Sequence, residues 1–376
     1  MNISFLTSGH YPFDDRIFFH MAKSLFENGD NIEVASSKID MKNFVDGISL
    51  NCFFGDNLSK NDKIKHFILI LSDFSPDIII CSEPLTILAA KKYAKRQSKK
   101  IKIVYDITEW YPSKKNLNAY KYPLKIFQFL KFTMFNIYAS CMADAFIFGE
   151  WYKSKPFRFI FSGKPFAYIT YYPDLKYIVK RKPEFSENKI RLSYSGKITS
   201  EKGFNNFISV LKVLSEYQNN LKIEAKIIGW YENERDKEKY KKLIQSLNEN
   251  INLSFHDKQS FCDFINLIND SDIFLDLRST DFENRHCLPI KLFYYAALER
   301  PVIFSNSKAI RKEVEISKFG FLVEPTDTNQ IVKIILRYLE NPNQYYEHCM
   351  NARNLTETHY NWEKLKPAFS NFIHSL

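Results

Sequence analysis

The chain has 376 residues, 45% of them hydrophobic and 26% charged, and this ordinary globular composition excludes a disordered, collagen-like or coiled-coil protein. At roughly 150 residues per domain, two domains are the simplest division of this length. The 53 Lys and Arg residues outnumber the 43 Asp and Glu residues by ten, which favours an anionic partner without choosing among nucleic acid, phosphate esters and a lipid surface.

The N-terminal half alternates short apolar strands with helices of amphipathic spacing. We expect strands at 3–7, 32–35, 77–81, 101–105 and 145–148, and helices at 16–26, 85–95 and 124–139. This alternation predicts a parallel sheet covered by helices on both faces.

The pattern weakens between 155 and 188, where prolines and charged clusters gather, and it then resumes. We expect strands at 190–194, 222–228, 252–255, 272–277, 301–304 and 319–323, and helices at 204–217, 261–268, 289–298 and 330–339. Two doubly wound α/β halves are predicted, and neither contains the G-x-G-x-x-G fingerprint of dinucleotide binding. The predicted divisions are an N-terminal domain at 1–172, a linker at 173–188, a C-terminal domain at 189–355, and a C-terminal helix at 356–376 that packs back on the N-terminal domain.

Cysteine usage and the N-terminus indicate the compartment. The six cysteines are scattered singly, without the spacing of a metal site, and are typical of free thiols in a reducing compartment. The N-terminus lacks the features of a signal peptide, and no stretch approaches the roughly 18 apolar residues of a membrane span. We expect a cytoplasmic protein, with contact at the inner face of the membrane left open.

The strongest local feature is the segment 195–203, which follows a strand and opens a helix. Lys197 and Lys202 bracket this turn, although a helix N-terminus carries a partial positive charge that disfavours cations. An anion between them would reverse the effect, because backbone N–H groups and ammonium groups would then act together. The segment therefore predicts an anion site, with a lysine-rich surface turn as the alternative.

A second basic segment precedes and opens the helix expected at 289–298. Arg285 and His286 lie just before it, Pro289 suits its first position, and Lys291 lies in its first turn. Ligands of open α/β sheets bind beyond the carboxyl ends of strands, which is where these residues are expected. A solvated basic turn beside a buried helix is the alternative.

Polar side chains also follow two strands of the N-terminal half, in the segments 9–16 and 106–112. Both segments are expected at the same edge of the sheet. The alternatives are structural, since Asp14 or its neighbour can cap the following helix and Asp106 can close a turn.

The segment 120–139 is rich in aromatic residues and carries Lys121, Lys125 and Lys131. Lysines on one edge and large apolar residues on the other are typical of a helix lying at a membrane surface. A core helix with snorkelling lysines is the alternative interpretation.

Five segments in chain order resemble motifs of the retaining GT-B glycosyltransferases of family four, the glycosyl transferases group 1. They are His10-Tyr-Pro-Phe-Asp-Asp-Arg-Ile-Phe, Tyr105-Asp-Ile-Thr-Glu-Trp-Tyr-Pro, Gly196-Lys to Lys202-Gly, Leu288-Pro-Ile-Lys-Leu-Phe-Tyr-Tyr-Ala-Ala with Arg300-Pro-Val-Ile, and Gly320-Phe-Leu-Val-Glu-Pro-Thr-Asp. Each motif alone is weak, but five in the right order over nearly the whole chain are a strong signal.

The resemblance implies a GT-B fold, in which two Rossmann-like, doubly wound parallel-sheet domains face a cleft. It implies transfer of a sugar from a nucleotide-diphosphate donor, bound by the C-terminal domain, to a glycan or lipid-linked acceptor, bound by the N-terminal domain. The anomeric configuration would be retained, without a metal and without a cofactor besides the nucleotide sugar. Synthesis of a cell-surface polysaccharide or glycolipid is the expected setting, with contact to an anionic membrane as a further expectation.

The resemblance also implies roles for single residues. Lys197 and Lys202 would neutralise the departing diphosphate, whose charge grows in the transition state, and Glu109 is the third catalytic candidate. The donor-binding candidates are Gly196, Gly203, Arg285, His286, Pro289, Lys291 and Tyr294. The acceptor or domain-cleft candidates are His10, Asp14, Arg16, Asp106 and Thr108, and no metal site is expected.

The chain departs from the family pattern at four positions. His286 and Tyr294 stand where the family carries paired acids, Thr108 replaces a histidine, and Glu299 replaces a glycine. A tyrosine hydroxyl can hydrogen-bond a ribose but cannot act as a carboxylate. These changes leave an inactive sugar-nucleotide-binding partner subunit and a GT-B sugar-nucleotide epimerase as alternatives, while the retained basic residues favour an active transferase.

A nucleic-acid partner is not expected. Such a protein needs basic residues clustered on one face together with base-stacking aromatic residues, and this sequence spreads both along the chain. An NAD-dependent oxidoreductase is disfavoured by the missing glycine fingerprint.

Overall fold

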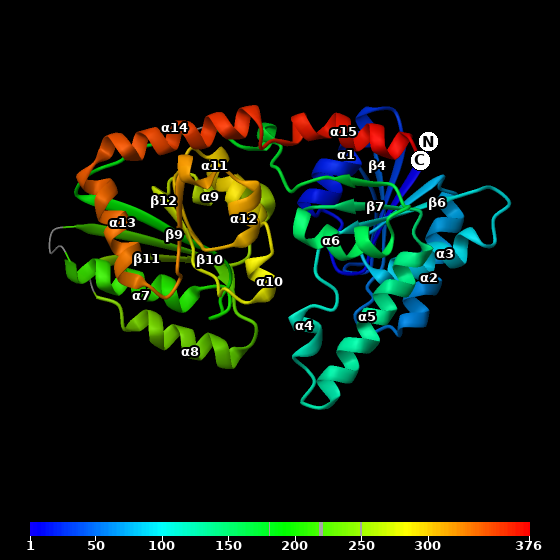
Figure 1. The fold of residues 1–376 in the computed structure, drawn as a ribbon, viewed down its shortest axis with the longest axis horizontal. Helices are drawn as coiled ribbons and strands as arrows, with labels where there is room; N and C mark the ends of the chain where they lie inside the picture. The colour runs from blue at the N-terminus through cyan, green and yellow to red at the C-terminus, as the bar shows by residue number, and fades with distance from the viewer. Residues whose placement is uncertain (180, 218–220, 249) are drawn as a thin grey trace. The chain divides into compact units, whose positions relative to one another are not determined.

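The computed structural model describes residues 1–376 except 180, 218–220 and 249. The chain forms two compact units (Figure 1), of which the first comprises Met1–Tyr171 with Leu365–Leu376 and the second comprises Tyr172–Lys364. The segment predicted as a linker, 173–188, lies in the second unit, apart from residue 180, which is outside the described residues.

The first unit is built on an eight-stranded sheet with the order β3-β4-β2-β1-β5-β6-β7-β8. The strands are β1 (Asn2–Thr7), β2 (Asn31–Ser36), β3 (Met41–Val45), β4 (Ile48–Cys52), β5 (Ile78–Cys81), β6 (Lys102–Ile107), β7 (Ala145–Phe148) and β8 (Phe166–Tyr168). All neighbours pair in parallel except β3 and β4, which form an antiparallel hairpin. The five predicted strands are confirmed, whereas β3, β4 and β8 were not predicted, and β3 is an exposed edge strand with no buried apolar face.

Helices cover this sheet on both faces. They are a π-helix (Asp15–Ala22) continuing into α1 (Lys23–Glu27), α2 (Lys60–Phe74), α3 (Pro84–Ala94), α4 (Lys114–Leu117), α5 (Leu124–Met142), α6 (Trp151–Ile160) and α15 (Trp362–His374), whose residues from Leu365 onward belong to this unit. The helix predicted at 16–26 thus begins one residue earlier and with π geometry. Side-chain contacts hold α15 against the N-terminal strands and helices: Asn28 Nδ2 donates to Ser370 Oγ at 2.8 Å, His374 Nε2 lies 2.7 Å from Asp30 Oδ2, and Lys366 pairs with Glu27.

The helix α5 is mostly uncovered. Along its 19 residues only Asn136, Ala139 and Ser140 are buried, and Figure 1 shows its N-terminal half, with α4 beside it, projecting from the sheet of the first unit. The interpretation of 120–139 as a core helix is therefore wrong, because a core helix buries a continuous apolar stripe.

The second unit is built on a six-stranded, wholly parallel sheet with the order β11-β10-β9-β12-β13-β14. Its strands are β9 (Lys189–Lys197), β10 (Lys222–Trp230), β11 (Ile251–His256), β12 (Ile273–Asp276), β13 (Val302–Ser305) and β14 (Gly320–Val323). Its helices are α7 (Phe204–Tyr217), α8 (Glu234–Gln245), α9 (Phe261–Ile268), α10 (Phe282–Arg285), α11 (Ile290–Ala297), α12 (Lys308–Glu313), α13 (Thr328–Glu340) and α14 (Pro342–Thr358). The six strands predicted here are confirmed.

The core of the second unit follows from alternation along its strands. Leu192 of β9, together with Ile223 and Ile227 of β10, points to the face where Phe207 of α7 and Ile335 of α13 are also buried. Burying side chains of this size stabilises the unit by about 1.5–3 kcal/mol each. The sheet is thereby a rigid base for the loops at its carboxyl edge.

Within the described residues, no helix combines the length and the apolar character needed to cross a bilayer.

Candidate functional site

The strand order of the second unit defines a switch point. From β9 the chain runs outward to β10 and β11 and then returns to the other side of β9 as β12. At such a reversal the loops that follow the two central strands diverge, which leaves a crevice at their carboxyl ends. The loop 198–203 follows β9, and the segment 277–289, which contains α10, follows β12.

Gly203 lets these two loops approach each other. Its φ of +83° is a backbone conformation that side chains disfavour, and a Cβ atom at this position would lie 2.2 Å from the carbonyl oxygen of Leu277. The loops are also bonded directly, since Ser279 N donates to the carbonyl oxygen of Glu201 at 2.8 Å. The close approach of these two loops therefore leaves no room for a side chain at position 203.

The buried carboxylate of Asp276 interacts with three cations at the end of β12. Asp276, the last residue of β12, accepts a hydrogen bond from Arg278 Nε at 2.6 Å. Burial by itself would raise the pKa of Asp276, but Arg278, Lys291 and Lys202 outweigh it and lower that pKa. Three cations around one carboxylate leave the crevice with net positive charge.

Lys291 connects the first turn of α11 to the end of β9. Its Nζ donates to the carbonyl oxygen of Ser195, and a Cβ atom on Gly196, where φ is +126°, would lie 2.8 Å from that nitrogen. The pKa of Lys291 is lowered to about 8, chiefly by burial and also by Arg278 and Lys202, while Asp276 acts in the opposite direction. A second anion beside Lys291 would favour its charged form.

Lys197, the last residue of β9, and Lys202, in the loop that follows, differ in their surroundings. Lys197 Nζ lies 2.5 Å from Glu232 Oε1, so the charge of Lys197 is paired with a carboxylate just beyond the end of β10. Lys202 is 41% exposed, and the carboxylate of Glu201 is 3.6 Å away, beyond direct hydrogen-bonding distance. Lys202 is thus better placed than Lys197 to bind an added anion.

One donor-site candidate, Pro289, differs from its predicted place in the helix, and two others, Tyr294 and His286, are engaged with neighbouring residues. Pro289 is the residue before α11 and not its first helical residue, because its ψ of 129° is extended and the helix begins at Ile290. Tyr294 is only 3% exposed and its ring packs 5.3 Å from that of Phe261 in α9. His286 Nδ1 lies 2.8 Å from the carbonyl oxygen of Phe282, within its own short helix turn.

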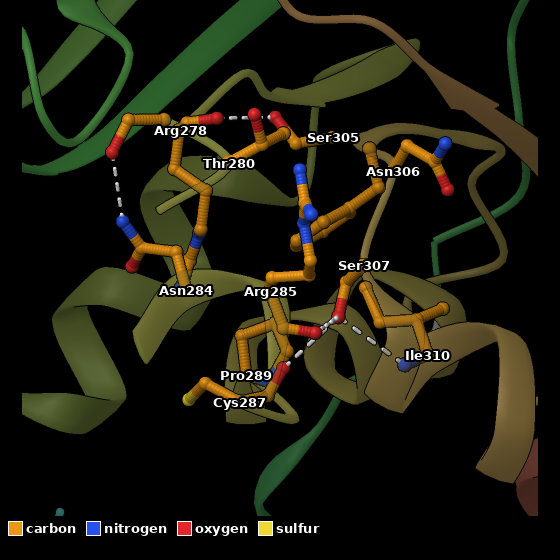
Figure 2. Close-up of a pocket in the computed structure, with 12 residues that line it drawn as sticks. Arg278, Thr280, Asn284, Arg285, Cys287, Pro289, Ser305, Asn306, Ser307 and Ile310 are labelled. Carbon is orange, nitrogen blue, oxygen red and sulfur yellow. Dashed lines mark hydrogen bonds between the residues drawn. The ribbon is translucent and has the colours of Figure 1, made fainter. Parts of the chain in front are cut away.

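Arg285 lines a neighbouring pocket at the carboxyl ends of β12 and β13. Figure 2 shows its side chain extending into this pocket, between Arg278 and Asn306. The lining also includes Arg278 and Ser279, and Ser279 N donates to the carbonyl oxygen of Glu201, so this pocket adjoins the Lys202 turn.

Several residues of this site were missed at the level of the sequence. Asp276 and Arg278 centre the basic cluster, and Tyr295 anchors its floor, with its hydroxyl 2.5 Å from Ser195 Oγ and its ring stacked on Phe274 at 3.9 Å. An acid and a base two residues apart at the end of an apolar strand, Phe274-Leu-Asp-Leu-Arg, were the available signal.

In the first unit, Arg16 and Asp106 form a buried ion pair. Arg16 Nε and Nη2 donate to the two oxygens of Asp106 at 2.8 and 2.7 Å, and Nη1 donates to the carbonyl oxygen of Ile169 at 2.7 Å. The side chains are 5% and 1% exposed. Both candidates are thereby engaged in joining the π-helix to β6 and to the segment after β8.

His10 and Asp14 form a second pair at the same edge. His10 Nδ1 lies 3.1 Å from Asp14 Oδ2, and Asp14 Oδ1 also accepts from the backbone N–H groups of Arg16 and Ile17 as the cap of the π-helix. Burial opposes protonation of His10, but Asp14, with Glu83 and Glu109, raises its pKa to about 10. His10 is therefore a cation at neutral pH.

The turn that carries Thr108 and Glu109 is held through one carbonyl group. The oxygen of Thr108 accepts from Tyr171 Oη at 2.9 Å and from Lys153 Nζ, and Lys153 is also paired with Glu150 at 2.7 Å. Glu109 helps to raise the pKa of His10 by its charge.

A further residue of this edge, Glu83, was not predicted. Its carboxylate accepts from Thr7 Oγ1 at 2.9 Å and from the backbone N–H groups of Ser8 and Gly9 at 2.8 and 2.9 Å. A Cβ atom on Gly9 would lie 2.7 Å from Glu83 Oε1, so the loop before His10 is shaped around this carboxylate.

Over the described part of the chain, no group of three or more His, Cys, Asp or Glu side chains is arranged to hold a metal ion.

Residues 177–355 match the model of the family Glycosyl transferases group 1. The matched range contains the turn with Lys202, the loop with Asp276 and Arg278, and the start of α11. No curated protein shows significant sequence similarity to the chain.

Solved structures match the chain over nearly its full length. Sucrose-phosphate synthase from Thermosynechococcus elongatus aligns with a TM-score of 0.74 at 13% identity, over 99% of this chain and 98% of that chain. HepE from Anabaena, solved in complex with UDP-glucose, aligns with a TM-score of 0.71 at 14% identity, over 100% and 99% of the two chains.

The fold is GT-B. The predicted pair of Rossmann-like, parallel-sheet domains is thereby confirmed. WaaG, a glycosyltransferase involved in lipopolysaccharide biosynthesis, shares the GT-B fold with a TM-score of 0.70 at 14% identity, over 98% of this chain and 99% of that chain. The family match and the GT-B structures support a glycosyltransferase.

Proposed function

We propose that the protein moves a sugar from a nucleotide-diphosphate donor to a glycan or lipid-linked acceptor, with retention of the anomeric configuration. The observation that carries the proposal is the basic cluster at the carboxyl ends of β9 and β12, where Arg278 is bonded to Asp276 and Lys291 to the carbonyl oxygen of Ser195. Lys202, on the loop after β9, also lowers the pKa of Asp276. A diphosphate is the anion that this charge and this fold suit together.

In the proposed reaction, the crevice stabilises the leaving nucleoside diphosphate. As the bond to the sugar breaks, negative charge accumulates on the diphosphate, so cations fixed in position stabilise the transition state more than the ground state. Lys202 and Lys291 supply this charge in the proposal, and the N-terminal turn of α7 adds backbone N–H groups. The proposed reaction needs no metal and no cofactor besides the nucleotide sugar.

The acceptor is proposed to bind the first unit, at the edge that carries His10, Asp14 and Glu109. A protonated His10 cannot accept a proton, so within this set the carboxylate of Glu109 is the group suited to hold an acceptor hydroxyl. Arg16 and Asp106 are assigned to positioning, because both are buried and paired with each other.

A nucleotide panel tests the proposal. The thermal unfolding of the full chain is followed with UDP, GDP, dTDP, ADP, CMP and NAD, each in excess. One nucleoside diphosphate at about 100 times its Kd should stabilise the protein by about 2.7 kcal/mol, which corresponds to at least about 5 °C. A shift with none of them, or with NAD alone, would contradict a nucleotide-sugar site.

Turnover of the matching nucleotide sugar separates the alternatives. A glycosyltransferase releases the nucleoside diphosphate in step with glycosylation of an acceptor, whereas an epimerase changes the sugar without any acceptor. Binding without turnover would assign the chain as an inactive partner subunit, in keeping with His286 and Tyr294 at the positions of the paired acids.

The uncovered helix α5 supports a proposed contact with an anionic membrane at its cytoplasmic face. Its exposed apolar residues are Leu124, Ile126, Phe127, Phe129, Leu130, Met134, Ile137 and Tyr138. Lys121 and Lys131 are exposed beside them, and Lys125 is half-buried. Large apolar side chains bordered by lysines suit the boundary between lipid head groups and acyl chains.

Reversing the charge of Lys121, Lys125 and Lys131 to Glu should abolish vesicle binding. Each lysine near an anionic surface contributes about 1 kcal/mol, so the triple variant should bind at least about 100-fold more weakly. The measurement is co-sedimentation with phosphatidylcholine vesicles with and without phosphatidylglycerol. The same reversal at Lys239, Lys241 and Lys242 of α8 is the control, and equal binding of both variants would remove α5 as the contact.

A further inference from the structure

The end of α6 and the edge strand β8 form an exposed surface of the first unit that the proposed reaction does not use. At the end of α6, Phe159 is 88% exposed and Ile160 is 50% exposed, and Phe166, the first residue of β8, is 37% exposed. Lys155 and Arg158 of α6 are exposed beside them. These five residues are called the α6 surface below. Neighbouring apolar side chains left in water and bordered by polar ones mark a site of contact with a protein or a membrane.

Arg158 joins the two elements of this surface. Its guanidinium lies 4.9 Å from the centre of the Phe166 ring, and Nη1 donates to Tyr168 Oη at 3.2 Å. Phe159 and Ile160 follow Arg158 directly in the chain. The exposed apolar side chains of α6 and β8 are therefore close to one another and to a fixed cation.

The charge of this part of the chain is one-sided. The stretch 151–172 contains four Lys or Arg residues and neither Asp nor Glu. Lys153 is buried and paired with Glu150. Within the described part of the chain, Lys155 and Arg158 have no carboxylate partner; Lys155 lies over the ring of Trp151 at 4.0 Å instead. Two uncompensated cations beside exposed apolar side chains favour an anionic partner.

The loop between α6 and β8 is bonded to the C-terminal end of α5. Lys164 Nζ donates to the carbonyl oxygens of Ser140 and Cys141 at 2.9 and 2.8 Å, and also to that of Ala143. The α6 residues of the surface directly precede this loop. The α6 surface therefore lies beside the end of the helix whose own apolar residues are uncovered.

We infer that the α6 surface inserts into the head-group region of an anionic lipid bilayer. Large apolar side chains suit the boundary with the acyl chains, and the cations beside them meet the lipid phosphates. The neighbouring α5 favours a bilayer over an acidic protein, because a bilayer can contact both elements at once; in this respect the α6 contact rests on the contact proposed for α5. A single helix on a bilayer leaves the protein free to rotate about the helix axis, and the second contact removes this freedom.

Phe159→Trp tests insertion directly. The emission of tryptophan moves to shorter wavelength when its ring leaves water, and bromine on nearby acyl chains quenches it. Vesicles of phosphatidylcholine with phosphatidylglycerol should produce both effects in the full-length variant. The control is Phe44→Trp, at a position of β3 that is 70% exposed, and it should respond no more than the unsubstituted protein. An equal response of the two variants would overturn the inference.

Affinity for the same vesicles tests the contribution of the side chains. Phe159→Ser with Ile160→Ser should weaken co-sedimentation at least about tenfold, since the apolar side chains no longer leave water. Lys155→Glu with Arg158→Glu should weaken it at least as much, by repulsion from the anionic lipid.

The matched control is Phe44→Ser with Leu69→Ser, which removes exposed apolar side chains from β3 and α2 and should leave vesicle binding unchanged. Thermal unfolding verifies that each variant is folded. Unchanged affinity in both α6 variants, or no vesicle binding by the unsubstituted protein, would overturn the inference and leave an acidic protein as the partner of this surface.

Comparison with the charge-reversed α5 variant separates the two contacts. Loss of binding in the α6 variants but not in the α5 variant would keep the α6 contact and remove the one proposed for α5. Loss in the α5 variant alone would overturn the inference. Failure of the nucleotide panel would remove the proposed glycosyl transfer and would change none of these vesicle results.

Discussion

Lys202→Ala should lower glycosyl transfer at least about 100-fold while changing the unfolding temperature by no more than about 2 °C. Removing one charged group that stabilises a developing anion typically costs 10²–10³ in turnover, whereas a surface substitution changes stability by about 0.5 kcal/mol or less. The side chain is 41% exposed and is 3.6 Å from the nearest carboxylate, that of Glu201, so folding depends on it little. Turnover is measured with the nucleotide sugar found in the panel, and stability by thermal unfolding.

The matched control for this variant is Lys241→Ala, which removes an exposed lysine from α8 of the same unit. It should change neither turnover nor stability. Unchanged turnover in Lys202→Ala would exclude Lys202 from the reaction, and a parallel fall in turnover and stability would make it a structural residue.

Asp106→Ala should destabilise the first unit by about 3–5 kcal/mol. The substitution leaves the guanidinium of Arg16 buried without a counter-charge, and this is more costly than the lost ion pair itself. The exposed fractions of 5% for Arg16 and 1% for Asp106 leave little access to compensating water. Urea unfolding measures the free energy, with the shift of the midpoint as the primary readout.

Two further variants test the cause of that loss. Asp56→Ala removes the acid of an exposed ion pair with Lys38 and should have little effect, because solvent already screens it. The double variant Arg16→Met with Asp106→Leu removes both charges and should recover part of the stability. A double variant as unstable as Asp106→Ala would show that packing, and not the isolated charge, causes the loss.

Local pattern was enough to predict much of the fold. The alternation of apolar strands with amphipathic helices predicted eleven strands that the structure contains, five in the first sheet and six in the second. These elements are specified by the period of their own side chains, which is 2 in a strand and about 3.6 in a helix. The strand β3 escaped prediction because an exposed edge strand lacks such a period.

The site residues that could be predicted from the sequence are likewise those whose signal lies within a short stretch of chain. The turn with Lys202 and Gly203 combines charge, a glycine and a helix start within a few residues, so sequence neighbours disclose it. Glu83 was missed because its partners are distant in the sequence: it binds the loop of Gly9, 74 residues earlier. Asp276 pairs with Arg278, two residues later, but the two lysines that also lower its pKa, Lys202 and Lys291, come from other segments. Each looked like an ordinary acid beside a strand.

The sequence by itself determined the identity and the period of the elements, the resemblance to glycosyl transferases group 1, and the positions of the basic turns. Only the tertiary structure decided that Lys291 meets Ser195, 96 residues earlier, and that Arg278, Lys291 and Lys202 together lower the pKa of Asp276. The reason is physical: strand order brings the loops after β9 and β12 together, and that order depends on packing summed over the whole sheet rather than on any local run of residues.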